Sequence, residues 1–161
     1  MLLPECTIFA TDYNKKTIAW CIENIPSVQF SINDLNPPTQ YESNFFDVVF
    51  GISIFTHLSE QNHKAWFEEL VRILSPGGIL LLTTHGIAFK EIMTDEEKTY
   101  FDDGNLVIRG NVKEGHRVFT AFHPETYMTG LFSTTCSILK HKSGSKKDWG
   151  IEQDTWILKK K

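Results

Sequence analysis

The sequence predicts an α/β fold with a mostly parallel sheet. Two observations support this prediction: short apolar strands alternate with amphipathic helical segments through residues 7–86, and one helix is followed directly by the unbroken apolar run 79–82. Such a run is typical of a strand that is buried on both faces of a parallel sheet. Strands that alternate with helices form βαβ units, and these units build parallel sheets.

The first predicted strand covers residues 7–11. A helix is then expected to begin after Asn14, whose side chain can cap the first turn, and to end before Pro26. Apolar residues recur at helical spacing between these two positions. The alternating segment 28–32 reads as the next strand.

A third strand is predicted over residues 47–51. Ser59 is the expected N-cap of a second helix, whose apolar stripe contains Trp66 and Leu70. The Ser-Pro-Gly-Gly segment 75–78 is expected to terminate that helix before the strand at 79–82 begins.

The second half of the chain is less regular. The pattern predicts an irregular helical stretch at 87–104, followed by a hairpin of 106–108 with 117–122. A short helix is expected to begin at 123–125, and two closing strands are expected at 134–140 and 154–159. No helical crossover separates the two closing strands, so we expect them to pair antiparallel.

Composition narrows the function classes. The 161 residues carry a formal net charge of -4, which argues against a nucleic-acid partner because phosphate binding needs clustered positive charge. The three cysteines form no CxxC pair, so neither a disulfide framework nor a zinc site is indicated, and a reducing, cytoplasmic setting is expected. No apolar run approaches the ~20 residues of a membrane helix.

Acidic residues follow the first two predicted strands. Open α/β sheets bind ligands beyond the carboxyl ends of their strands, where Asp12 and Asp34 are expected. An acid at a strand end can accept hydrogen bonds from both hydroxyls of a ribose, and a second acid can accept one from an adenine amino group. The arrangement therefore suits an adenosine-containing ligand.

Residues 7–86 resemble the cofactor half of a class I S-adenosylmethionine-dependent methyltransferase. The resemblance lies in ATDYN (10–14), SINDL (31–35), FFDVVFGISIFTHL (45–58) and RILSPGGILLLTT (72–84), and QDTWILKK (153–160) is similar to the closing hairpin of that family. It implies a Rossmann-like three-layer sandwich with a mostly parallel sheet and an antiparallel C-terminal strand pair. It further implies one domain, 1–161, with a cofactor-binding half at 7–86 and a substrate-side half at 87–161.

The resemblance also implies roles for individual residues. Asp12 would hold the ribose hydroxyls and Asp34 the adenine amino group. The cofactor-binding set as a whole is Asp12, Tyr13, Asp34, Leu35, Gly51 and Ile52. Two alternatives stay open from the residues alone: Asp12 can cap the following helix, and Asp34 can form an Asx turn.

Histidines are the candidate groups for catalysis and substrate contact. His57 matches a family position that faces the reactive centre, where it would act as a general base, although it can equally hydrogen-bond the backbone at its turn. His85, His123 and Tyr127 are candidate substrate contacts. Phe119 and Phe122 fit core packing better than a substrate pocket, and no metal site is expected.

The sequence departs from the family at its N-terminus. Only eleven residues, none of them glycine, precede Asp12, whereas the family carries its first strand and a glycine-rich loop there. We therefore expect the first strand to be missing, together with ~40 to 60 residues of a typical domain. The edges of strands 7–11 and 47–51 would then pair with each other, with a second copy in a homodimer, or with a partner segment.

The expected reaction is transfer of a methyl group from S-adenosylmethionine to an O, N or C nucleophile of a small molecule, with S-adenosylhomocysteine as product. Neither a nucleic acid nor a membrane is an expected partner. The alternative is a non-catalytic, truncated domain that serves as a binding module or a remnant. A nicotinamide-dependent dehydrogenase would need a GxGxxG segment about 20 residues before its acid, and none is present.

Overall fold

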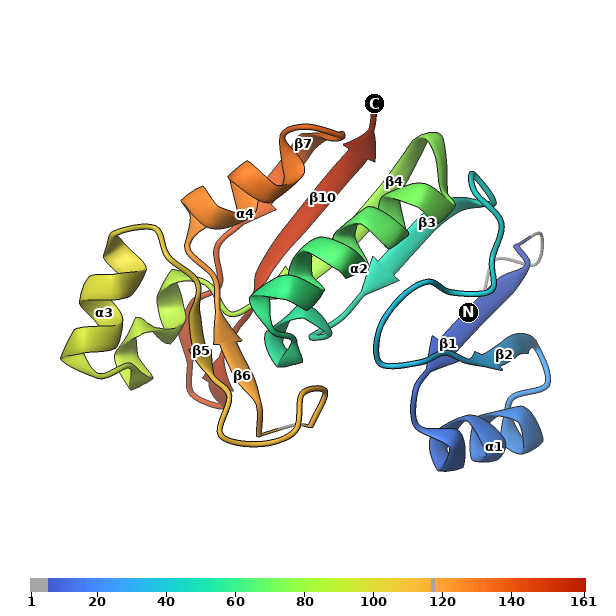
Figure 1. Ribbon diagram of the computed structural model, residues 1–161, viewed down its shortest axis with the longest axis horizontal. Coiled ribbons are helices and arrows are strands. Elements are labelled where there is room, and N and C mark those ends of the chain that lie inside the picture. The colour runs from blue at the N-terminus through green and yellow to red at the C-terminus, as the bar shows by residue number, and fades with distance from the viewer. Residues whose placement is uncertain (1–5, 117) are drawn as a thin grey trace. The chain divides into compact units, whose positions relative to one another are not determined.

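A computed structural model of the chain describes residues 6–116 and 118–161. The chain divides into two compact units, one up to Gln40 and one from Tyr41 onward (Figure 1).

The first unit is a single βαβ motif. Strand β1 (Ile8–Asp12) leads through helix α1 (Lys15–Asn24) to strand β2 (Val28–Ile32), and the two strands pair in parallel, with Asp12 opposite Ile32. Asn14 is confirmed as the N-cap of α1, because its side chain accepts hydrogen bonds from two backbone amides of the first turn. The parallel register brings the carboxyl ends of both strands to one edge.

The second unit is built on a mixed four-stranded sheet. Its strands are β3 (Phe46–Gly51), β4 (Leu74–Thr84), β10 (Asp154–Lys160) and β7 (Cys136–Lys142), in that spatial order. β3 and β4 are parallel, and β10 is antiparallel to both of its neighbours, so the expected antiparallel closing pair is confirmed. Among the described residues, the single, mostly parallel sheet predicted from the sequence is replaced by the two-stranded parallel sheet, this mixed four-stranded sheet and two small antiparallel pairs.

Helices α2 (Glu60–Ile73) and α4 (Glu125–Phe132) cover one face of the four-stranded sheet (Figure 1). Alternate residues of the central strands point into the resulting core. The buried cluster contains Phe55, Phe67, Val71, Leu74, Leu80, Leu82, Met128, Phe132, Cys136, Trp156 and Leu158. Trp66 and Leu70 pack against it, as their helical spacing predicts.

The Ser-Pro-Gly-Gly segment forms a bulge rather than a helix end. Helix α2 stops at Ile73, and β4 begins at once, before the segment. The pairing register with β3 shifts across residues 75–78, where Gly77 has a φ of 78°. This left-handed backbone lets the chain leave the ladder and return to it, so the glycine belongs to the strand.

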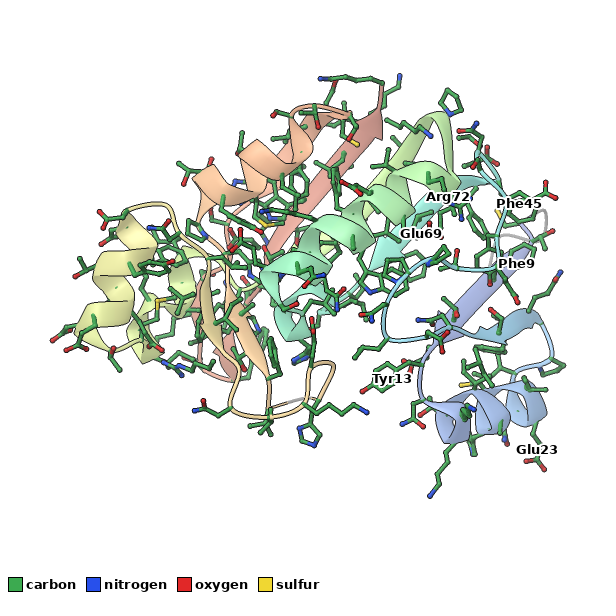
Figure 2. The ribbon with its side chains drawn as sticks, in the orientation of Figure 1. Phe9, Tyr13, Glu23, Phe45, Glu69 and Arg72 are labelled. Atoms are coloured by element: carbon green, nitrogen blue, oxygen red, sulfur yellow. The ribbon has the colours of Figure 1, made fainter. Side chains whose placement is uncertain are left out.

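Both ends of α2 are tied to their surroundings. Ser59 is confirmed as its N-cap. Near the other end, Arg72 makes two hydrogen bonds of 2.7 and 2.8 Å with the carboxylate of Glu69, which is buried, and a third of 2.8 Å with the backbone carbonyl of Tyr41 (Figure 2). The guanidinium thereby fixes the segment that leads into β3.

The second half follows the predicted order of elements. It contains the 3-10 segment η2 (Ile87–Ile92), helix α3 (Asp95–Asp102) and the hairpin of β5 (Val107–Arg109) and β6 (Thr120–Phe122). Arg117, the expected start of the second hairpin strand, lies outside the described residues. Phe119 and Phe122 are buried, in agreement with a packing role.

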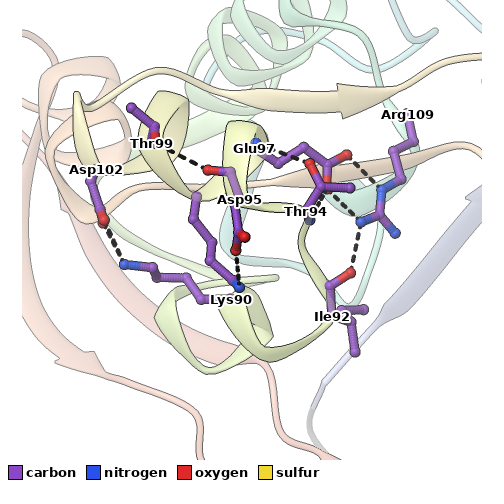
Figure 3. Close-up of polar contacts among 9 residues, drawn as sticks. Lys90, Ile92, Thr94, Asp95, Glu97, Thr99, Asp102 and Arg109 are labelled. Carbon is purple, nitrogen blue, oxygen red and sulfur yellow. Dashed lines mark hydrogen bonds and ion pairs between the residues drawn. The ribbon is translucent and has the colours of Figure 1, made fainter.

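Helix α3 is held by a capping box and an ion pair (Figure 3). The Thr94 side chain accepts a hydrogen bond from the Glu97 backbone, and the Glu97 side chain accepts one from the Thr94 backbone. The Arg109 guanidinium also binds the Glu97 carboxylate, at 2.6 Å, and lowers its pKa to about 2. These contacts join α3 to β5.

Within the described part of the chain, β1 and β3 each have a strand neighbour on one side only. Among the same residues, no helix combines the length and apolar character needed to cross a membrane.

Candidate functional site

In the first unit, Asp12 and Asp34 lie at the ends of neighbouring parallel strands, since β1 and β2 end opposite each other. Asp12 Oδ1 accepts a hydrogen bond of 2.7 Å from the backbone amide of Asn14. This contact orients the carboxylate, while Asn14 itself caps the helix. Asp34 is exposed just after β2.

Tyr13 and Leu35 each directly follow one of these acids. Tyr13 projects from the turn between β1 and α1 (Figure 2), and its side chain is 45% exposed. Leu35 is half-buried. An aromatic ring and an aliphatic side chain of this kind have the chemistry to cover a purine face.

In the second unit, three polar side chains join the ends of three strands. Gln153, just before β10, accepts a hydrogen bond of 2.5 Å from Thr83 Oγ1 of β4. Its Nε2 donates a bond of 2.8 Å to Ser53 Oγ, two residues after β3. The backbone amide of Ser53 in turn donates to Thr83 Oγ1 at 2.8 Å. Ser53 has a φ of 61°, a conformation this closed network maintains.

Gly51 and Ile52 immediately precede Ser53 in the chain. A Cβ at Gly51 would lie 3.2 Å from Leu82 Cδ2, so the lack of a side chain lets β3 and β4 pack closely here. Ile52 is 56% exposed. Gly51 therefore has a packing reason in addition to the role that the family resemblance implies.

A buried carboxylate closes the same edge of the sheet. Asp154, opposite Thr84 at the end of β4, accepts a hydrogen bond of 2.8 Å from the backbone amide of Gly144 and lies 2.9 Å from His141 Nε2. The His141 ring stacks on Trp156 at 3.6 Å. A Cβ at Gly86 would come within 2.1 Å of this carboxylate, so only glycine fits there.

His57 is engaged with the backbone of the β5–β6 hairpin. Its Nδ1 lies 2.7 Å from the carbonyl oxygen of Phe119, which can only accept, so the Nδ1 carries the proton. Its own carbonyl accepts a bond of 3.0 Å from Gly115. This is the backbone-binding alternative weighed for His57, and its role as a general base stays a prediction.

Two buried histidines share a hydrogen bond. His63 Nδ1 donates to the carbonyl of Ser59 at 2.7 Å, so the Nε2 of a neutral His63 accepts from His123 Nε2, 2.8 Å away. Burial lowers the pKa of both rings, that of His123 well below its usual value. His123 is 1% exposed, so a substrate would reach it only if the ring were uncovered.

His85 lies beside this pair. Its ring stacks on Phe89 at 4.1 Å, and its backbone carbonyl accepts a hydrogen bond of 2.8 Å from the amide of His123. Burial, and to a lesser degree the neighbouring His57, lower the pKa of His85 to about 4. The structure thus brings the predicted residues His57, His85 and His123 together and adds His63, which sequence reasoning did not place among the candidate site residues.

Tyr127 lies away from the strand ends, on α4. It lines a cavity of about 670 Å³ between α2 and α4, together with Phe67 and Leu131. Burial raises the pKa of Tyr127 to about 12. Its contact with a substrate stays a prediction.

In residues 6–116 and 118–161 no cluster of three or more His, Cys, Asp or Glu side chains could hold a metal ion.

Comparison with known proteins decides the family. The sequence profile of a family described as "Methyltransferase domain" matches residues 2–82. The chain belongs to this family. The resemblance to class I enzymes, whose methyl donor is S-adenosylmethionine, is thereby confirmed.

Solved structures share the methyltransferase fold. An S-adenosylmethionine-dependent methyltransferase from Methanosarcina mazei aligns over 96% of this chain and 82% of its own, with a TM-score of 0.73 and 14% identity. The 1,6-didemethyltoxoflavin-N1-methyltransferase of Burkholderia thailandensis, solved with S-adenosylhomocysteine, aligns over 94% of this chain and 60% of its own, with a TM-score of 0.65 and 10% identity.

A curated relative corrects the expected partner of this methyltransferase domain. A tRNA (carboxymethyluridine(34)-5-O)-methyltransferase of Arabidopsis thaliana is 34% identical over 83 residues, which are 51% of this chain and 20% of that protein. The expectation of a small-molecule acceptor and no nucleic acid is therefore wrong. Net charge does not decide the partner, because it averages over the whole chain whereas phosphate binding depends on local clusters of cations.

Proposed function

We propose that this methyltransferase domain transfers the methyl group of S-adenosylmethionine to a carboxylate carried by a modified uridine of tRNA. The observation that supports this acceptor is the 34% identity over 83 residues with an enzyme named for carboxymethyluridine in tRNA. The chain spans a fifth of that relative's length. On this proposal, the domain would bind both S-adenosylmethionine and a tRNA.

The chemistry of the strand ends fits the cofactor. Asp12 offers a carboxylate oxygen to a ribose hydroxyl while its Oδ1 stays bound to the Asn14 amide, and Asp34 is exposed to accept from an adenine amino group. Tyr13 and Leu35 would cover the purine, and Gly51 with Ile52 would line the methionine side. When bound, S-adenosylmethionine supplies a methyl group on a sulfonium sulfur, which needs no further activation.

A carboxylate acceptor does not require a general base. Its pKa is about 4, so it is ionised at neutral pH and already nucleophilic. The protein then has to align the oxygen with the methyl group and exclude water, rather than remove a proton. His57, whose Nδ1–H binds Phe119, would hold the β5–β6 hairpin in place.

Two measurements test the proposal. Calorimetric titration with S-adenosylhomocysteine reports the cofactor site, and we expect saturable binding with one equivalent per chain. Incubation with tritiated S-adenosylmethionine and tRNA that contains carboxymethyluridine reports the acceptor, with the same tRNA lacking the carboxymethyl group as the matched control. Binding without transfer to either RNA would contradict the acceptor, and failure to bind would favour the non-catalytic module.

A further inference from the structure

The segment between β7 and β10 concentrates positive charge in an acidic chain. Residues 140–150 contain four lysines, Lys140, Lys142, Lys146 and Lys147, and a single acid, whereas the whole chain carries -4. All four lysines are exposed. A local positive potential of this kind attracts a polyanion even when the net charge of the chain is negative.

An exposed tryptophan lies next to these lysines. Strands β8 (Lys146–Lys147) and β9 (Gly150–Ile151) form a small hairpin whose two-residue turn is Asp148 and Trp149. Trp149 is 75% exposed, more than any other large apolar side chain of the described residues. An indole that is left in water beside lysines is a stacking platform for unpaired bases.

The hairpin is anchored at the edge of the sheet where β4 ends. Asp154 binds the amide of Gly144 before the hairpin and pairs with Thr84, the last residue of β4. Gln153, which follows the hairpin, bonds to Thr83 of β4 and to Ser53 after β3. The same side of the sheet therefore holds Gly51 and Ile52, proposed above to face the methyl donor.

Two of the lysines form ion pairs with acidic neighbours but remain exposed. Lys146 pairs with Glu91 and Lys147 with Glu152, the latter at 3.6 Å. The lysine side chains of these pairs remain 68% and 43% exposed, so each ammonium can also meet a phosphate. Exposed pairs of this kind contribute little stability, and a phosphate can replace the carboxylate at small cost.

We infer that the β8–β9 hairpin is an RNA-docking element, in which Trp149 stacks on an unpaired base and Lys146 and Lys147 hold the flanking phosphates. The inference rests on the proposed RNA acceptor and says where on the domain the RNA binds. A single-stranded loop is the matching ligand, because its bases are free to stack while a duplex keeps them paired.

Fluorescence anisotropy tests this element with a labelled 17-nucleotide stem-loop RNA that has a seven-nucleotide loop with a central uridine. Trp149→Ala should weaken binding by about fivefold or more, and Trp149→Phe should restore most of it. The double variant Lys146→Ala/Lys147→Ala should weaken binding about tenfold at low salt and lower the slope of log K against log salt by between about one and two.

The matched control removes the same charge at the other end of β10. Lys159 and Lys161 are exposed there, and Lys159 lies opposite Ile79 near the start of β4. Lys159→Ala/Lys161→Ala should leave the affinity and the salt slope unchanged. Equal losses in both double variants, or loss with the lysines but not with Trp149, would show general polyanion binding and overturn the inference.

The outcome is separable from that of the proposed function. If the wild-type chain methylates tRNA while the hairpin variants bind the stem-loop as well as wild type does, the docking inference is wrong and the acceptor stands. If the hairpin variants lose binding as expected but no tRNA is methylated, the proposed reaction is wrong and the docking surface stands. The melting temperature of each variant, measured in parallel, shows that the fold is intact.

Discussion

Gln153 donates a hydrogen bond of 2.8 Å to Ser53, although the two residues are 100 positions apart in the chain. The same amide accepts from Thr83. One side chain thus joins the segment after β3, the end of β4 and the start of β10. The first of these segments follows Gly51 and Ile52, and the last follows the β8–β9 hairpin, so one amide ties both to the end of β4.

Gln153→Leu should destabilise the domain. The substitution keeps the approximate volume but removes the hydrogen bond that Gln153 makes with each of two partly buried hydroxyls, Ser53 and Thr83, which costs about 1–3 kcal/mol in all. Urea unfolding measures the loss. Gln61→Leu, on the exposed face of α2, is the matched control and should change the free energy of unfolding by less than about 0.5 kcal/mol. Equal effects of the two variants would mean that the network is not stabilising.

The buried histidines predict acid sensitivity. Burial lowers the pKa of His63, His85 and His123, so the folded chain keeps them neutral where the unfolded chain, with a pKa of about 6.5, takes up protons. The neutral rings should therefore make their whole contribution to the free energy of unfolding above pH 7, and this contribution should be lost as the pH drops from about 6.5 to about 4. Urea unfolding across this range measures the slope.

His85→Gln isolates one of these contributions. The pKa of His85 falls to about 4, so the variant should lose up to about 3 kcal/mol of pH dependence between pH 7 and pH 4. Gln61→Leu, which removes no titratable group, supplies the control and should leave the pH dependence as in wild type. A wild-type curve that is flat from pH 7 to pH 4 would contradict the buried, neutral state of the cluster.

Asp12→Asn tests the cofactor site. Asparagine keeps an oxygen for the Asn14 amide, so the turn should persist, but it loses the charge that would strengthen a bond to a ribose hydroxyl. We expect the Kd for S-adenosylhomocysteine to rise about 10- to 100-fold, with an unchanged melting temperature of the free protein. Glu23→Gln, on α1, removes the same charge and should bind as wild type does (Figure 2). Unchanged affinity in Asp12→Asn would remove Asp12 from the site.

His57→Asn separates positioning from base catalysis. The asparagine amide can replace the Nδ1–H that binds the Phe119 carbonyl, but it cannot accept a proton. With a carboxylate acceptor we expect kcat within a few-fold of wild type and no change in its pH profile from pH 6 to pH 9. A loss of about 100-fold or more, together with disappearance of the fall in kcat at low pH, would restore His57 as a general base.

Local signals in the sequence predicted the elements well, while contacts between distant segments were out of reach. Asn14 and Ser59 were recognised as caps because an N-cap acts on amides within its own turn. The Ser53–Gln153 bond depends on the register of β10 against β4, and the His63–His123 bond joins residues 60 positions apart. A local sequence pattern predicts neither the register of two distant strands nor a hydrogen bond between distant side chains.

Net charge shows the same limit of sequence patterns. It is summed over all residues, whereas Lys146, Lys147 and Trp149 are gathered on the small β8–β9 hairpin, which the apolar pattern did not predict. The quantity that governs a polyanion partner is the charge of one surface, which the fold defines.

The chemical stability of the transferred methyl group tests the central claim most directly. A methyl ester is cleaved by mild alkali, whereas a methyl group on nitrogen or carbon is not. After incubation with tritiated S-adenosylmethionine and tRNA that contains carboxymethyluridine, we predict RNA-bound tritium that alkali releases as volatile methanol. RNA-bound tritium that survives alkali, or no tritium on the RNA at all, would contradict the account.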